Sequence, residues 1–286
     1  MMPDFFLTLE RQLALEIDSQ EIRNYVRTTY ARTRIAEPLA GVPLDRAAIR
    51  GQGRHRGVEF NGRPIELEPG VEPGDFRLGF YGSSRLFQES FRCNDAWLSF
   101  HGAAVGMPAG AIVFVAASGA GKTTLVLALL DRGARLFSDE FVLVRRADRA
   151  VSGYPRTFMI REPALPEIAN ARIRARCRPG EAKVSSAGFN IWHGIDPVDI
   201  YGPDVYASPA PLAGIVLLER GADKTARCER VPTAIASIEL ARRFNSLQTG
   251  FGRLTDLAEL FAGVRTYRVT LGDVAAAAGL LNEAFA

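Results

Sequence analysis

One strand-turn-helix segment in the middle of the chain constrains the fold more than any other. Ala111 to Ala117 is a continuous apolar run with the length and β-branched residues of a strand buried on both faces. A glycine-rich turn follows, and Lys122 to Leu130 then has the pattern of a helix. Gly133 lies just past that helix, and Ala134 to Phe137 is the next expected strand. This order predicts a βαβ core within an α/β sheet.

The turn has the form of a phosphate-binding loop. The residues from Ala116 to Thr123 read AASGAGKT and match the pattern GxxxxGK[ST], except that alanine replaces the first glycine. Backbone N–H groups of such a turn and of the following helix N-terminus converge on one spot and favour a polyphosphate. Lys122 is then expected against the β and γ phosphates, and the Thr123 hydroxyl on Mg²⁺. The plainer alternative is a turn that only joins strand to helix.

Alanine at position 116 predicts weaker nucleotide binding without its loss. The first glycine of the pattern lets the chain leave its strand in a conformation that a Cβ can crowd. Alanine is tolerated there if its φ is negative.

A pair of acids follows the next expected strand. Asp139 and Glu140 come where the chain reaches the carboxyl end of that strand, which faces the ligand crevice in an open α/β sheet. Near a magnesium nucleotide, one carboxylate can take the proton of an incoming hydroxyl while the other holds the metal. A solvated turn is the alternative interpretation.

Three segments together resemble the catalytic domain of the HPr kinase/phosphorylase family. They are His101-Gly102, the loop and helix start from Ser118 to Leu125, and the sequence RGARLFSDE from Arg132 to Glu140. The resemblance is strong over residues 97–145 and holds in outline over 145–286. It implies a P-loop sheet with flanking helices and the use of ATP and Mg²⁺.

The resemblance also implies roles for individual residues. Lys122 would bind phosphate, Thr123 would bind Mg²⁺, and Asp139 would be the catalytic base for phosphoryl transfer to serine. The second family aspartate is Glu140 here, and we assign it to the metal. His101 would donate a hydrogen bond near the acid pair, or else be a strand histidine satisfied by the core. The nucleotide-binding residues would be Ser118, Gly119, Ala120, Gly121, Lys122, Thr123 and Thr124.

Two departures place the chain nearer to the small kinases related to this family than to its regulatory members. The loop ends in Thr-Thr instead of Ser-Glu, and the family segment LEIRGLG is missing after the acid pair. Its nearest counterpart, Met159 to Glu162, has arginine and acid in reversed order, which leaves the roles of Arg161 and Glu162 open. The relatives include serine kinases that modify peptides, such as those of lasso-peptide clusters, and kinases of free small molecules. Kinase action is correspondingly favoured over phosphorolysis, and whether phosphorylase activity exists stays open.

The predicted function is an ATP- and Mg²⁺-dependent kinase that transfers the γ-phosphoryl group to a hydroxyl, with serine of a peptide, protein or small molecule as the expected acceptor. The alternative is a nucleotide-binding regulatory module without rapid catalysis, in which the nucleotide acts as a switch. An ABC-type ATPase is disfavoured because the chain has no LSGGQ-like signature.

Other residues have two interpretations each. Arg156 and Arg161 are candidate cations for the transferring phosphoryl group, or surface arginines. Glu219 ends an apolar strand from Ile215 in the manner of a Walker B acid, which would place Glu219 on the metal. We prefer Asp139 to Glu219 as the acid at the site. The long segment from Arg178 to Pro211 is expected to be a loop that closes over substrate, or a surface loop. Its candidate substrate contacts are Lys183, Trp192 and His193.

Two domains are predicted, with a boundary near residue 92. Residues 1–92 form a small α+β N-terminal domain for substrate or partner recognition, and residues 93–286 form the catalytic domain. In the first, Phe5 to Ile17 is expected to be a strand pair or one long irregular strand, and Ser19 caps a helix from Gln20 to Arg32. The expected elements near the C-terminus are helices at Thr233 to Phe244 and Leu254 to Phe261, a strand at Val264 to Leu271, and a last helix capped by Asp273.

Composition narrows the partners. The 286 residues hold 35 basic and 32 acidic side chains, and a net charge of +3 does not indicate nucleic acid. Three scattered cysteines indicate neither disulfides nor zinc, and buried reduced thiols are expected. Residues 96–121 lack charges, but glycines and Pro108 interrupt them, so no membrane helix is predicted. Without a signal-peptide pattern we expect a cytoplasmic protein, and the family resemblance suggests a homo-oligomer.

Overall fold

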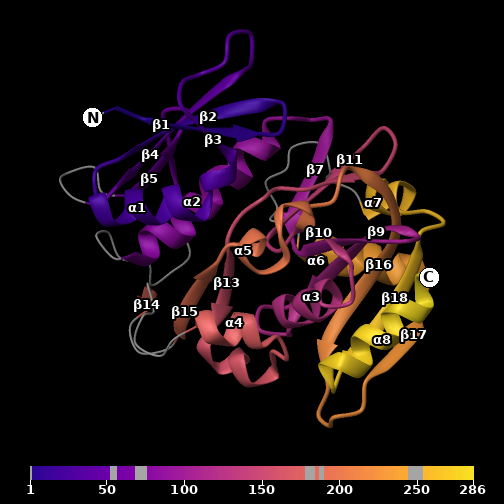
Figure 1. The fold of residues 1–286 in the computed structure, drawn as a ribbon. Helices are drawn as coiled ribbons and strands as arrows, with labels where there is room; N and C mark the ends of the chain where they lie inside the picture. Colours follow the sequence, from indigo (N-terminus) through magenta and orange to yellow (C-terminus); the bar gives the residue numbers. More distant parts are fainter. Residues whose placement is uncertain (1, 52–56, 68–75, 178–183, 187–189, 244–253) are drawn as a thin grey trace. The chain divides into compact units, whose positions relative to one another are not determined.

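The computed structural model describes residues 2–51, 57–67, 76–177, 184–186, 190–243 and 254–286 (Figure 1). The chain divides into two compact units. The first comprises Met1–Asp95, Pro155–Met159 and Pro179–Gly194, and the second comprises Ala96–Tyr154, Ile160–Arg178 and Ile195–Ala286. Each unit combines helices with a β-sheet, so the fold is mixed α/β.

The first unit is built on a six-stranded sheet in the order β3-β1-β2-β4-β5-β6. Only the β2–β4 pair is parallel, and the others are antiparallel. The predicted strand pair and the Ser19 cap are confirmed, and the Ser19 hydroxyl accepts from the N–H of Ile22. The elements are β1 (Asp4–Thr8), β2 (Arg11–Ile17), α1 (Gln20–Thr29), β3 (Arg34–Ile35), β4 (Leu44–Arg50), β5 (Gly57–Phe60), β6 (Arg63–Ile65) and α2 (Phe76–Arg92).

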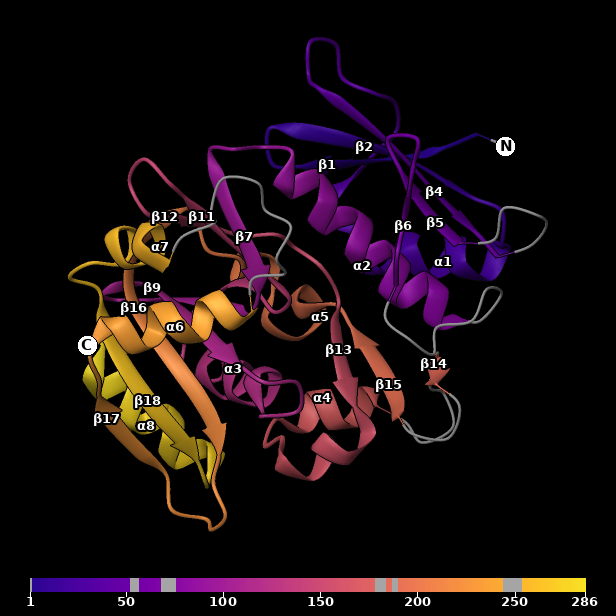
Figure 2. The same ribbon diagram turned by 180° about the vertical axis from the view of Figure 1, so that it is seen from behind.

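Helix α2 was not predicted from the sequence. Gly79 and Gly82 lie in its first half, and glycine is a poor helix former. Both glycines are explained by packing, because a Cβ at Gly79 would lie 2.8 Å from Ile22 of α1, and one at Gly82 would lie 2.8 Å from Val58 of β5. The helix therefore lies against both α1 and the sheet (Figure 2).

The second unit contains a nine-stranded sheet. Its path is β10-β8-β9-β16-β12-β11-β7, and β18 pairs with β16 and β17. A separate three-stranded sheet has the order β13-β15-β14, and its strand β14 and most of β15 belong to the first unit. The strands are β7 (Trp97–His101), β8 (Ala103–Met107), β9 (Gly110–Ala116), β10 (Arg135–Ser138), β11 (Phe141–Arg145), β12 (Ala150–Ser152), β13 (Phe158–Arg161), β14 (Val184–Ser186), β15 (Asn190–Ile195), β16 (Ala210–Arg220), β17 (Arg227–Arg230) and β18 (Arg265–Leu271).

Six α-helices follow β9 in the described part of the chain, and the predicted ones among them have the expected bounds within two residues. The six helices are α3 (Lys122–Leu130), α4 (Ala171–Arg176), α5 (Pro197–Tyr201), α6 (Thr233–Arg243), α7 (Leu254–Leu260) and α8 (Val274–Ala284). Of these, α4 and α5 were not predicted. Asp273 caps α8 as expected, since its carboxylate accepts from the N–H of Ala276.

The predicted βαβ core is present with one strand inserted into it. Strands β9, β16 and β18 are parallel neighbours. Because β8 is antiparallel to both β9 and β10, β10 also runs parallel to β9. The carboxyl ends of β9, β10, β16 and β18 consequently meet at one edge of the sheet, where ligands bind in open α/β folds.

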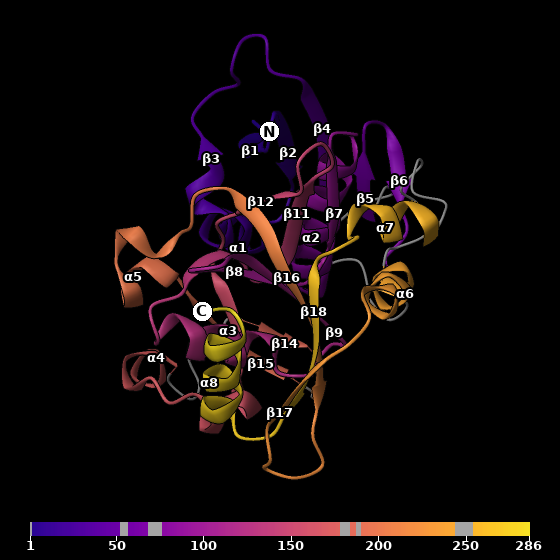
Figure 3. The same ribbon diagram turned by 90° about the vertical axis from the view of Figure 1, so that its right-hand side faces the viewer.

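Helices cover both faces of this sheet (Figure 3). Ala111, Val113 and Val115 of β9 belong to a buried cluster that also includes Leu240 of α6 and Leu257 of α7. The alternate residues of β9 point to the other face, which α3 and α8 cover.

The segment from Arg178 to Pro211 is not one loop, contrary to expectation: its described residues form β14, β15, α5 and a 3₁₀ turn.

The cysteines form no disulfide. Burial raises the pKa of Cys177 to about 11, but Cys93 is exposed, contrary to expectation. Residues 96–121 form strands, and no helix among the described residues is long and apolar enough to cross a membrane.

The stability of the first unit depends on a buried carboxylate. Asp45 accepts two hydrogen bonds from Arg11, one from Ser90 and one from Asn61, and its side chain is 1% exposed. Replacing Asp45 with alanine leaves Arg11 without this partner and should cost about 3–5 kcal/mol.

Urea unfolding of the full chain measures this loss. Glu16→Ala is the control, because its ion pair with Arg50 joins side chains that are 46% and 40% exposed and should contribute less than about 1 kcal/mol. Equal midpoints for the two variants would show that the buried network adds no stability.

Candidate functional site

The glycine-rich loop, residues Ala116 to Thr123, connects β9 to α3. Gly119 and Gly121 have φ values of +79° and +99°, a region that favours glycine. At Gly121 a Cβ would also lie 2.3 Å from Leu271 of β18. Gly121 is the N-cap of α3 and offers no side-chain oxygen, so the first-turn N–H groups of this helix have no side-chain cap. The loop thus provides backbone donors for an anion.

Ala116 fits its position without strain. It is the last residue of β9 and is 2% exposed. The described non-glycine residues with positive φ are Leu9, Asn61 and Arg149, so φ at Ala116 is not positive. The condition under which alanine can replace the first glycine is therefore met.

Thr123 and Asp139 are brought together. Thr123 lies in the first turn of α3 and Asp139 follows β10, and the Thr123 hydroxyl donates to Asp139 Oδ2 at 2.8 Å. The contact exists because β10 returns parallel to β9, which places the turn after β10 beside the start of α3. The Ser138 hydroxyl shapes that turn by accepting from the N–H of Phe141 at 3.2 Å.

His101 and Glu140 form a second pair at the same edge. His101 Nδ1 lies 3.2 Å from Glu140 Oε1, and both side chains are partly exposed. The next residue, Gly102, donates its N–H to the Glu140 carbonyl. A Cβ on Gly102 would lie 2.7 Å from the backbone oxygen of Phe114, so β9 leaves room only for glycine there. This packing gives a physical reason for the His-Gly pair.

Two cations lie at the loop. Lys122 Nζ is 3.3 Å from the Ala116 carbonyl and 3.4 Å from the Ala117 carbonyl, so its side chain folds back over the loop. Arg161, the last residue of β13, donates to the Ser118 hydroxyl at 2.9 Å. Its Nη1 would lie 3.6 Å from a Cβ on Gly119. Arg161 therefore adds a second positive charge to the loop.

The remaining candidates differ in location, and Glu219 lies at the same sheet edge as the loop, because Leu218 before it pairs with Ala116. Glu219, near the end of β16, accepts from Thr270 at 3.1 Å and lies 3.9 Å from Arg268, and Glu162 begins the 3₁₀ helix after β13. Arg156 belongs to the first unit, where its guanidinium lies over the Tyr30 ring. His193 is buried in that unit, and its Nε2 has no hydrogen-bond partner among the described residues. Lys183 and the Trp192 side chain lie outside the described residues.

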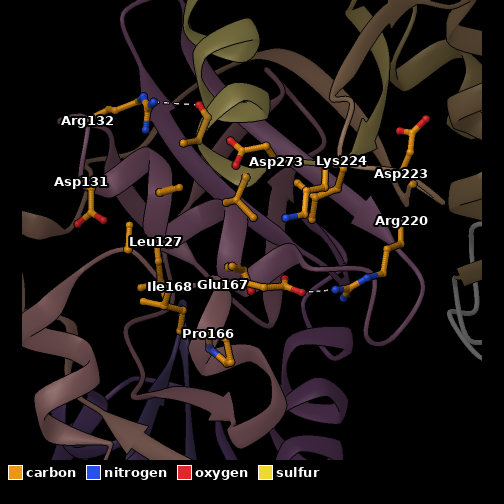
Figure 4. A pocket seen from close by; sticks show the side chains of 18 of the residues that line it. Leu127, Asp131, Arg132, Pro166, Glu167, Ile168, Arg220, Asp223, Lys224 and Asp273 are labelled. Atoms are coloured by element: carbon orange, nitrogen blue, oxygen red, sulfur yellow. Dashed lines mark hydrogen bonds and ion pairs between the residues drawn. The ribbon is translucent and has the colours of Figure 1, made fainter.

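A cavity of about 650 Å³ lies beside α3 (Figure 4). Its lining includes Thr124, the residue after the loop, and the turns that follow β16 and β18. Ala120 and Thr124 are both buried. No sequence pattern indicates this cavity, because its walls come from four segments far apart in the chain.

The residues at the loop suit a magnesium ion by their chemistry. Mg²⁺ takes oxygen ligands, keeps several waters and uses few protein groups. The Thr123 hydroxyl and the Asp139 carboxylate are in contact, and Glu140 follows in the chain. These oxygens match that ligand preference.

Comparison with known proteins finds similar solved structures, and a kinase/phosphatase with a low TM-score is among them. No protein-family model matches the sequence, and no curated protein matches it. The HPr(Ser) kinase/phosphatase from Coxiella burnetii is similar in structure at 12% sequence identity, with 65% of this chain and 95% of that chain covered and a TM-score of 0.33. This similarity is low in both sequence and backbone geometry.

The loop geometry yields a test through its second glycine. Gly121→Ala places a Cβ at positive φ, which costs about 1–2 kcal/mol, and against Leu271. We expect loss of binding of inorganic tripolyphosphate, measured by calorimetry with Mg²⁺ present.

Gly133→Ala is the matched control. Its φ is +91°, yet a Cβ there meets nothing within 4 Å. The variant should therefore carry the free-energy cost of the positive φ alone, with tripolyphosphate binding unchanged. Unaltered binding in Gly121→Ala would show that the loop does not hold phosphate.

Proposed function

We propose that this protein is a kinase that transfers the γ-phosphoryl group of ATP to a hydroxyl group, with Mg²⁺ as its metal. The observation that carries the proposal is the hydrogen bond from Thr123 to Asp139. It joins the start of a helix suited to phosphate to a carboxylate that can take a proton. Serine of a peptide, protein or small molecule is the proposed acceptor.

Asp139 acts as the general base in this scheme. The acceptor oxygen forms a bond to the γ-phosphorus while the bond from that phosphorus to the β–γ bridging oxygen breaks. ADP leaves with the bridging oxygen, and the acceptor proton passes to Asp139. The hydrogen bond from Thr123 holds the carboxylate in position for this transfer.

Positive charge at the loop stabilises the transferring group. Lys122 lies over the loop and Arg161 is bonded to Ser118, so two side-chain cations face the place where phosphate charge develops. Thr123 and Glu140 would hold Mg²⁺, which supplies further charge neutralisation on the phosphate oxygens. His101 lies against Glu140 and acts as a positioning residue for it.

Replacing Asp139 with asparagine tests the base. Asparagine keeps the shape of the side chain but does not accept the acceptor proton, so we expect transfer to fall by about 10²–10⁴-fold with ATP binding retained. The assay follows label from γ-³²P-ATP into a panel of serine-containing peptides, free serine and small alcohols.

The same assay separates the kinase from a nucleotide-binding module. Turnover by the unaltered protein that depends on an acceptor supports the kinase, whereas ATP binding without any acceptor-dependent product supports the module. Full transfer activity in Asp139→Asn would remove Asp139 from the mechanism.

Arg161 is expected to act on the rate of transfer. Arg161→Gln removes a charge at the loop and should lower kcat by about 10²-fold. Arg176→Gln is the control, because Arg176 pairs with Asp199 on the surface of the same unit. Equal rates for the two variants would show that Arg161 serves only to hold the loop.

A further inference from the structure

We propose that the cavity beside α3 binds the nucleoside part of the donor nucleotide. The inference rests on the proposed function, since it assumes that the loop holds the phosphates. It adds a second binding region, which lies on the opposite side of β9 from Asp139.

Strand order fixes which end of the nucleotide reaches the cavity. Strand β10, which delivers Asp139, lies on one side of β9, and β16 and β18 lie on the other. We therefore place the rest of a triphosphate whose terminal group faces Asp139 on the opposite side of β9, toward β16 and β18. The turns after those two strands, Arg220–Lys224 and Leu271–Ala275, line the cavity.

Two consecutive residues in the first turn of α3 also face different sides. Thr123 donates to Asp139, while the next residue, Thr124, lines the cavity. Successive helical residues are about 100° apart around the axis. A nucleotide lying across this helix end would thus have its γ-phosphate near Thr123 and its sugar and base near Thr124.

The cavity has the size and lining of a nucleoside site. Ligand pockets of about 300–1,000 Å³ are typical of small molecules, and they combine apolar walls with a few polar groups. Leu127 and Ile168 supply apolar surface, and Lys224 and Asp273 lie at the opposite wall (Figure 4). A planar base can pack on Leu127 and Ile168. The ring nitrogens of the base or the ribose hydroxyls can form hydrogen bonds with Lys224 and Asp273.

Hydrogen bonds hold the cavity walls together without a ligand. The N–H of Asp273 donates to the Lys224 carbonyl at 2.8 Å, and the N–H of Gly221 donates to the Leu271 carbonyl at 2.9 Å. Arg220 is paired with Glu167, which joins the wall after β16 to the wall before α4. Arg132 donates to the Ala275 carbonyl at 2.9 Å. Such preformed walls lower the entropic cost of binding.

The acceptor is a poorer occupant. Its hydroxyl must reach Asp139, which lies on the β10 side of the loop, whereas the cavity opens on the β16 side. A small acceptor bound in the cavity would place its hydroxyl away from the base.

Filling the cavity tests the proposal. Ala128 of α3 lines it and is partly exposed, so Ala128→Phe places a ring in the space. Dissociation constants for ATP and for inorganic tripolyphosphate are measured by calorimetry with Mg²⁺ present. We expect ATP to bind at least about tenfold more weakly, with tripolyphosphate unchanged, because only ATP carries a nucleoside.

Two further variants complete the design. Ala276→Phe is the control: Ala276 is in the first turn of α8 but does not line the cavity, so both ligands should bind it normally. Ala222→Phe fills the cavity from the opposite wall without altering α3. This variant should also weaken the binding of ATP and not that of tripolyphosphate, even if Ala128→Phe disturbs the helix.

The outcomes distinguish this proposal from the proposed function. If the unaltered protein binds tripolyphosphate as tightly as ATP, or if Ala222→Phe leaves ATP binding intact, the nucleoside site is wrong while the kinase stands. The nucleoside site is also wrong if the two cavity-filling variants raise only the KM for the acceptor. If the unaltered protein binds neither ligand, the phosphate loop itself is wrong and both proposals fail.

Discussion

The hydrogen bond between Thr123 and Asp139 is the contact on which the functional account depends. It requires β9 and β10 to run in the same direction, with α3 as the connection between them, so that both end at one edge of the sheet. Strands β16 and β18 end at that edge as well, and they add the cavity walls. Parallel strand direction thus brings the loop, the acid pair and two of the cavity walls from distant parts of the chain to one edge of the sheet.

Much of the fold could be predicted from local patterns. The bounds of α3 and the caps at Ser19 and Asp273 follow from sequence because caps and helical periodicity are local properties. Helix α2 could not, since Gly79 and Gly82 lower its local propensity while tertiary packing requires them. The insertion of β8 between β9 and β10 was also hidden, because strand pairing over such distances leaves no mark on local sequence.

The same distinction applies to the candidate site. The glycine-rich loop and the acid pair each lie within a few residues, so their spacing was visible in sequence. Arg161 was one of two candidate arginines, and only the fold shows that it contacts Ser118 whereas Arg156 contacts Tyr30. Nothing in the sequence marked Lys224 and Asp273 as neighbours; that relation follows from the hydrogen bond between their backbones in the two turns after β16 and β18.

A crystal structure with Mg²⁺ and a non-hydrolysable ATP analogue tests the central claim most directly. We expect the phosphates to lie over Gly119–Thr123, with the terminal phosphate beside the carboxylate of Asp139. A complex with the triphosphate away from this loop, or with its terminal group pointing to the β18 side, would contradict it.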